Sequence, residues 1–176
     1  MATYGMLINT KKCVGCYACR VACQMKNELT KDKSYLHFEE LETGVYPSVY
    51  VEQVPIQCMH CVDAPCQSVC PTGATFTTDT GVVLVEEGKC IGCKYCMVAC
   101  PYGVRTQLHS GVVEKCRFCW ENDGPDHPSC VSTCVSGARI FGDIDDPESE
   151  ISKAIAKNNA LPIAGNLTKS KIFYVR

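Results

Sequence analysis

The arrangement of cysteines constrains this chain more than any other feature of its sequence. Sixteen cysteines occur in 176 residues, a density at which a disulfide framework or a metal-rich protein becomes the leading interpretation. A chain of this length has room for one ordinary domain or two very small ones. The cysteines form four groups of four, with none left over: Cys13, Cys16, Cys19 and Cys23; Cys58, Cys61, Cys66 and Cys70; Cys90, Cys93, Cys96 and Cys100; and Cys116, Cys119, Cys130 and Cys134.

The four groups are related by an internal repeat. The first and third share the spacing CxxCxxCxxxC, whereas the second and fourth open with CxxC and close with CxxxC, soon followed by a Gly-Ala pair. We therefore expect a duplicated unit, with the first pair of motifs in residues 1–80 and the second pair in residues 81–142. Residues 143–176 are expected to add a C-terminal helix and strand.

The predicted secondary structure is short. β-Branched runs at 49–54, 82–85 and 171–175 indicate strands, and a short helix is expected just after the third cysteine of each group. An acidic start followed by apolar residues at helical spacing predicts a helix within 145–161 that opens near Pro147. The expected fold is α+β, a duplicated bacterial-ferredoxin-like fold with short strands, short helices and long loops.

Three cysteines at two-residue intervals offer three thiolates from seven residues, which suits an iron–sulfur cluster better than a single zinc ion. Bacterial ferredoxins use the spacing CxxCxxCxxxCP, in which the fourth cysteine ligates the other cluster of a pair. Residues 90–101 fit this pattern fully, whereas Cys23 is followed by Gln24 in place of proline. The sequence therefore predicts four 4Fe-4S clusters.

The crossing of the fourth ligand leads to a hypothesis about which cysteines share a cluster. If the first group pairs with the fourth and the second with the third, two di-cluster modules result, and they interleave the two repeats. The ligand sets are then Cys13, Cys16, Cys19 and Cys134 (cluster 1); Cys23, Cys116, Cys119 and Cys130 (cluster 2); Cys58, Cys61, Cys66 and Cys100 (cluster 3); and Cys70, Cys90, Cys93 and Cys96 (cluster 4).

Two other interpretations compete with clusters. A disulfide framework suits a secreted chain, but it rarely repeats CxxCxxC runs, whose neighbouring cysteines are poorly spaced to pair. Structural zinc suits CxxC pairs, and the fourth group alone resembles such a site.

Because every cluster already has four cysteines, the histidines are expected to be structural. The cations that flank the cysteines either offset cluster charge or lie in solvent; they are Lys12, Lys89, Lys94, Lys115 and Arg117.

Charge and hydropathy argue against several other classes. The net charge of −2, without a dense Lys/Arg run, argues against a nucleic-acid partner. No run approaches the ~20 consecutive apolar residues that span a bilayer. The residues before Cys13 leave no room for a secretion signal. We therefore expect a soluble chain that meets a membrane only through a partner.

Beyond the cysteines, several passages resemble one family over nearly the whole chain. They are residues 13–16, 66–74, 90–105 and 141–149. With these passages the chain resembles the four-cluster iron–sulfur subunits of the molybdopterin oxidoreductase (dimethyl sulfoxide reductase) family, most closely the polysulfide and thiosulfate reductase type. The resemblance implies a non-catalytic electron-transfer subunit, and it implies the same pairing of cysteine groups.

The resemblance also implies partners and a compartment. A large subunit would hold the molybdopterin cofactor and do the chemistry, and a quinone-binding membrane subunit or another carrier would exchange electrons with this chain. Clusters 1 and 2 would lie toward the catalytic subunit and clusters 3 and 4 toward the membrane. The chain would work in the cytoplasm or be exported with a partner that carries a twin-arginine signal. A freestanding polyferredoxin, or an accessory carrier of a hydrogenase or formate system, is the alternative.

Overall fold

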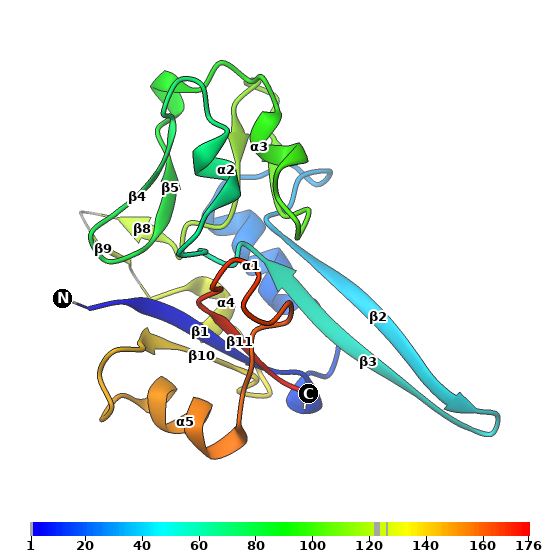
Figure 1. Ribbon diagram of the computed structural model, residues 1–176. Helices are drawn as coiled ribbons and strands as arrows, with labels where there is room; N and C mark the ends of the chain where they lie inside the picture. Colours follow the sequence, from blue (N-terminus) through cyan, green and yellow to red (C-terminus); the bar gives the residue numbers. More distant parts are fainter. Residues whose placement is uncertain (1, 122–123, 126) are drawn as a thin grey trace.

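The computed structural model describes residues 2–121, 124–125 and 127–176. Its helices are short and are joined by loops (Figure 1). Many of the cysteines lie in these loops. The helices are α1 (Ala18–Lys26), α2 (Pro65–Ser68), α3 (Tyr95–Val98), α4 (Ser129–Ser132) and α5 (Glu150–Asn158), with 3-10 turns η1 (Thr10–Lys12) and η2 (Glu87–Lys89). The strands are β1 (Tyr4–Asn9), β2 (Leu36–Val45), β3 (Ser48–Gln57), β4 (Thr75–Thr77), β5 (Val83–Val85), β6 (Thr106–Gln107), β7 (Val113–Glu114), β8 (Trp120–Glu121), β9 (Gly124–Pro125), β10 (Arg139–Asp143) and β11 (Ile172–Val175).

A three-stranded sheet in the order β10-β1-β11 supports the cysteine-rich part of the molecule. Strand β1 pairs antiparallel with β10 and parallel with β11. Its side chains alternate across the sheet: Met6 and Ile8 join the main core, whereas Leu7 packs with Ile151 of α5 on the other face. Helix α5 thus covers one face (Figure 1), and the other face packs against the core that contains the buried cysteines.

Strands β2 and β3 form a long antiparallel hairpin that projects from the body as an arm (Figure 1). Its base joins the main core through Val54 and Ile56, whereas Val45 and Tyr46 at its tip are 81% and 88% exposed. In this part of the chain the sequence predicts one strand, at 49–54. Strand β3 extends beyond that range at both ends, and its partner β2 is not predicted. The alternation that marks a half-buried strand is missing from the outer part of the arm because neither of its faces is buried.

Each cysteine group has a helix that contains its third cysteine. Helices α1, α2, α3 and α4 include Cys19, Cys66, Cys96 and Cys130 respectively. They begin one residue before the third cysteine rather than just after it, as the sequence had suggested. Helix α1 packs against α4, and α2 packs against α3. The helices of the first and fourth groups are therefore neighbours, as are those of the second and third groups.

The C-terminal segment agrees in kind with its prediction. Helix α5 lies inside 145–161, and it begins after Ser149, whose side chain accepts a hydrogen bond from the N–H of Ser152 and so caps the helix. This cap, rather than Pro147, sets the start of the helix. The mixture of small sheets and short helices is an α+β fold, as expected. Within the described residues, no helix is both long and apolar enough to cross a membrane.

Candidate metal centres

Thiols that are far apart in the sequence line three shared cavities. Each cavity takes three cysteines from one group and one from another. The cavities are lined by the first thiol set (Cys13, Cys16, Cys19 and Cys134), the third thiol set (Cys58, Cys61, Cys66 and Cys100) and the fourth thiol set (Cys70, Cys90, Cys93 and Cys96).

The remaining four cysteines, Cys23, Cys116, Cys119 and Cys130, are the second thiol set. They interact electrostatically with one another: Cys23 with Cys130 and Cys119, and Cys116 with Cys23 and Cys130. Burial is the largest cause that raises the pKa of Cys23 to about 12 and the pKa of Cys116 well above its ordinary value, and the neighbouring thiols raise both further. All sixteen cysteines are free thiols.

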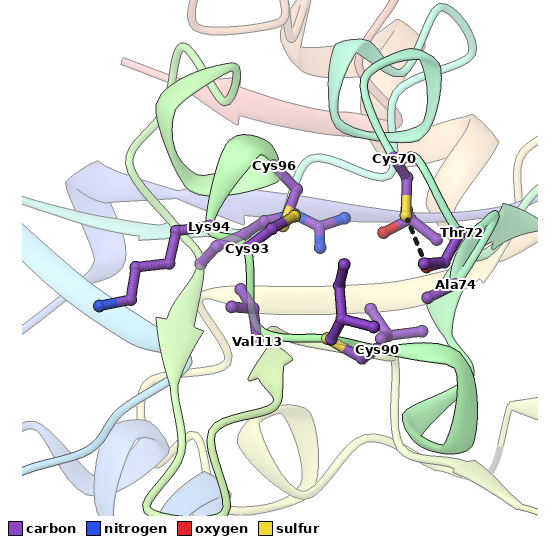
Figure 2. Close-up of a pocket in the computed structure, with 12 residues that line it drawn as sticks. Cys70, Thr72, Ala74, Cys90, Cys93, Lys94, Cys96 and Val113 are labelled. Carbon is purple, nitrogen blue, oxygen red and sulfur yellow. Dashed lines mark hydrogen bonds between the residues drawn. The ribbon is translucent and has the colours of Figure 1, made fainter.

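The fourth set illustrates how distant segments converge (Figure 2). Cys90, Cys93 and Cys96 come from one loop and the start of α3, whereas Cys70 follows α2 and faces them across the cavity. The Sγ of Cys70 lies 3.7 Å from the hydroxyl oxygen of Thr72. The side chain of Lys94, although it belongs to the same loop, points away from the cavity (Figure 2). The thiols thus converge while the cation of the loop faces outward.

Residues with a left-handed backbone conformation turn the loops of the first and third cysteine groups. Gly15 and Tyr17 have φ of +64° and +59°, and the equivalent Gly92 and Lys94 have φ of +68° and +65°. Turns of this kind aim successive backbone N–H groups toward one side and form a concave site for an anion. Glycine is required at 92 because a Cβ there would lie 2.7 Å from the carbonyl oxygen of Gly111.

One thiol in each of the first and fourth sets has a lowered pKa and so ionises more readily than an ordinary cysteine. Burial raises the pKa of Cys70, but hydrogen bonds from the backbone around Thr75 and Thr72, and from the Thr72 hydroxyl, lower it to about 7. The pKa of Cys134 is also lowered, because backbone N–H groups outweigh its partial burial, and the N–H of Ala138 donates to its Sγ at 3.2 Å. The thiolate is the form that binds metal, so these two positions are prepared for it.

Four buried cations lie near the thiol sets. Arg105, Arg139, Lys115 and Lys171 are 5%, 4%, 1% and 5% exposed, and the charge of Lys171 acts on Cys61 and Cys58. Lys115 is one of the five cations that flank cysteines in the sequence. The other flanking cations, Lys12, Lys89, Lys94 and Arg117, are exposed. Arg105 and Arg139 were missed, although each stands five residues after the last cysteine of its group. That shared spacing after the last cysteine of a group is the signal by which sequence reasoning could have found them.

The histidines take no part in lining the cavities, within the described residues. His60 is fully buried, stacks on Phe118 with 3.8 Å between ring centroids, and accepts a hydrogen bond at Nδ1 from the N–H of Val83. Burial first, and nearby cations second, hold the pKa of His60 well below its ordinary value, so the ring stays neutral.

Across the described chain, no group of three or more His, Cys, Asp or Glu side chains is arranged to hold a single metal ion.

Comparison with known proteins agrees with these features. Residues 49–144 match the family model of a 4Fe-4S dicluster domain. The chain is 35% identical to the iron–sulfur subunit of the arsenate respiratory reductase of Shewanella sp. (strain ANA-3), over 98% of this chain and 95% of the relative.

Two further relatives come from sulfur-compound reductases. The B subunit of the polysulfide reductase of Wolinella succinogenes is 35% identical over 98% of this chain and 93% of its own length. The electron transfer subunit of the thiosulfate reductase of Salmonella typhi is 39% identical over 88% and 82%. The resemblance expected from the cysteine motifs is therefore confirmed: the chain belongs to the iron–sulfur electron-transfer subunits of the dimethyl sulfoxide reductase family, and it is an electron-transfer subunit rather than a catalytic one.

Proposed function

We propose that each of the four thiol sets binds one 4Fe-4S cluster and that the chain relays electrons through all four. The observation that carries the proposal is that three separate cavities are each lined by four thiols from two distant cysteine groups. A bound cluster supplies reversible electron transfer. The chain supplies four thiolates to each, leaves no cysteine of the second and third sets (the inner sets) exposed within the described residues, and directs N–H groups and cations toward the sulfurs.

The arrangement and charge of the thiol sets favour clusters over structural zinc. A tetrahedral zinc site draws four thiolates to about 2.3 Å from one ion. Within the described residues, no three or more His, Cys, Asp or Glu side chains are arranged to hold a single metal ion, although four thiols and a buried guanidinium line each cavity. An anionic group larger than a single ion accounts for both observations.

The proposed layout consists of two interleaved di-cluster modules. The first and second sets form one module and the third and fourth sets the other, which the packing of α1 on α4 and of α2 on α3 supports. We further propose that residues 1–80 and 81–142 are duplicated units and that 143–176 is a C-terminal addition. The matching left-handed turns at Gly15 and Gly92 support the duplication.

The first and fourth sets (the outer sets) are the proposed ends of the relay, because Cys16 and Cys93 are the exposed cysteines. We propose that the first set faces a molybdopterin-containing catalytic subunit, and that the fourth set faces a quinone-linked membrane subunit or another carrier. Support comes from the relatives, which are named as subunits of reductases. If the catalytic partner carries a twin-arginine signal, the folded chain is exported with it.

Metal analysis of the anaerobically purified chain tests the cofactor. Four clusters correspond to about sixteen iron atoms per chain, with as much acid-labile sulfide. About four zinc atoms with little iron and no visible absorption would contradict the proposal.

The pairing of cysteine groups is tested by a matched pair of variants. Cys134→Ser should disturb the centre held by Cys13, Cys16 and Cys19, whereas Cys130→Ser, only four residues away, should spare it. Electron paramagnetic resonance spectra of the reduced variants report which centre changes. If Cys134→Ser left the first set intact and altered only the second set, the proposed exchange of ligands would be refuted.

Co-purification separates the proposed role from that of a freestanding polyferredoxin. A chain built to serve a catalytic subunit should be isolated with a large molybdenum-containing polypeptide in stable proportion. Isolation of a fully loaded monomer, without such a polypeptide at any stage of growth, would favour the freestanding carrier.

A further inference from the structure

Arg105 stands between the third and fourth thiol sets. Its side chain lines the cavities of both sets, and its charge acts most strongly on Cys66 of the third set and Cys96 of the fourth. Within the described residues, its three guanidinium nitrogens have no oxygen or nitrogen partner, and the groups beside them are the thiols of Cys66 and Cys96. Burying an unpartnered guanidinium is costly unless an opposite charge lies beside it. Arg105 is therefore placed to face anions in both cavities.

Arg139 occupies the equivalent place between the first and second sets. It lines the cavity of the first set, its Nη1 lies 3.9 Å from the Sγ of Cys130 in the second set, and its charge acts on Cys130 and Cys19. Nη1 also donates to Gln57 Oε1 at 2.6 Å, whereas Nη2 has no partner among the described residues. Gln57 thus fixes the guanidinium without neutralising it.

Lys115 lies between the two modules. It lines the cavity of the third set, and its ammonium donates to the carbonyl oxygen of Cys116, a member of the second set, at 3.0 Å and also to the carbonyl oxygen of Val83. Its charge is the main electrostatic influence that opposes the rise of the Cys58 pKa caused by burial. The Glu114 carboxyl also interacts with it electrostatically, although burial raises the pKa of that carboxyl and so disfavours its charged form.

We infer that Arg139, Lys115 and Arg105 occupy the three junctions of the relay and that each raises the reduction potentials of the two clusters beside it. The inference rests on the proposed function, since it requires the four clusters. Reduction adds one electron to a cluster and no proton, so the site becomes more negative by one charge. A nearby cation stabilises that added charge, and burial keeps solvent from screening it.

Exposed cations should act much more weakly. Lys94 also lines the cavity of the fourth set, but it is exposed and points away from the thiols (Figure 2). Removing its charge is the matched control for Arg105, because both residues neighbour the same thiol set and differ in burial. The contrast separates a buried charge from the net charge of the chain.

The test is a mediated redox titration of the anaerobically purified chain, followed by electron paramagnetic resonance. Arg105→Met should shift two of the four centres to lower potential, with at least a tenfold change in the ratio of oxidised to reduced cluster at fixed potential, which is about 59 mV. Arg139→Met should shift the other two. Lys115→Met should shift one centre of each pair. Arg105→Lys should restore most of the potential, and Lys94→Met should change the ratio less than twofold.

The outcomes distinguish this inference from the proposed function. If the wild-type chain holds zinc, the proposed function fails. If the wild-type chain holds iron, and Arg105→Met or the milder Arg105→Gln loads the same iron but leaves all four potentials unchanged, only the inference fails. Equal shifts in Arg105→Met and Lys94→Met, or shifts of all four centres in each variant, would also overturn it, because a purely structural role or a bulk charge effect would explain them.

Discussion

The inner and outer thiol sets differ in their access to water and in the state of their thiols. Cys16 and Cys93 of the outer sets are exposed, whereas no cysteine of the inner sets is exposed within the described chain. Hydrogen bonds lower the pKa of Cys70 in an outer set to about 7, while burial raises that of Cys23 in an inner set to about 12. The pKa of Cys134 in the other outer set is lowered as well, although burial raises the pKa of Cys19 and of Cys96 in the same two sets. Each outer set therefore has one thiol that ionises more readily before metal arrives, whereas burial raises the pKa of Cys58 and of Cys116 in the inner sets.

The largest expected effect comes from removing one ligand of an inner set. Cys116 interacts with Cys58 of the neighbouring inner set, so Cys116→Ser should expose both inner sites and reduce the iron content to about half. Cys93→Ser, in an outer set, should remove only about a quarter. Iron and sulfide analysis measures both. Equal losses of iron in the two variants would show that disturbing one inner site does not expose the other.

A second expected effect concerns the aromatic contact between the inner sets. Phe118 is 1% exposed, and the ring of His60 on which it stacks lies between Cys58 and Cys61. Phe118→Ala should cost ~3–5 kcal/mol of stability by opening a cavity there. Tyr95→Ala, beside an outer set and 61% exposed, is the control and should cost far less.

The decay of visible cluster absorbance in guanidinium measures this difference. Absorbance should disappear much faster in Phe118→Ala than in the wild type, with Tyr95→Ala close to the wild type. Similar decay in the two variants would mean that the contact between the inner sets does not limit the stability of the loaded chain.

A smaller effect should separate the two outer sets. Alanine at either Gly15 or Gly92 must adopt a left-handed conformation, which costs ~1–2 kcal/mol. At Gly92 the new Cβ would also meet the backbone oxygen of Gly111 at 2.7 Å, whereas at Gly15 it would meet the movable side chain of Gln53 at 3.0 Å. Gly92→Ala should therefore lose stability and iron from the fourth set more readily. Equal midpoints of thermal bleaching would contradict this.

The smallest effect is the pH dependence of the thiols after anaerobic removal of iron. A thiol whose pKa is lowered from about 9 to about 7 stabilises the fold fully above about pH 9, and this contribution is lost as pH falls through 7. Cys70 should accordingly react with iodoacetamide with a midpoint near pH 7, while Cys23 should remain unreactive until strongly alkaline pH. Peptide mass spectrometry measures both rates. A common midpoint for the two thiols would mean that the difference requires the bound metal.

Local patterns in the sequence predicted the parts of this fold that local chemistry controls. The capped helix α5 and the strand β11 follow from spacing and composition, and the cysteine repeats identify the family. The ligand assignment of each cluster stays a prediction, although the thiols of each predicted set lie around one cavity or interact with one another.

The features that the sequence did not predict depend on tertiary contacts. Strand β2 is held by its pairing with β3, and no buried stripe marks its outer part. Arg105 and Arg139 resemble ordinary surface charges when taken singly, because only the fold shows that each one lies between two thiol sets. Charged residues are rarely buried without an opposite charge, so neither arginine taken alone predicts its own burial.

A reductive titration of the purified chain tests the central claim most directly. With four clusters that each accept one electron, the anaerobic chain should take up about four electrons and regain its visible absorbance on reoxidation. Uptake of about two electrons would mean that only one of the two modules holds redox-active clusters. Uptake of none, with the thiols still protected from alkylation, would mean that the thiol sets hold a redox-inert metal and would contradict the account.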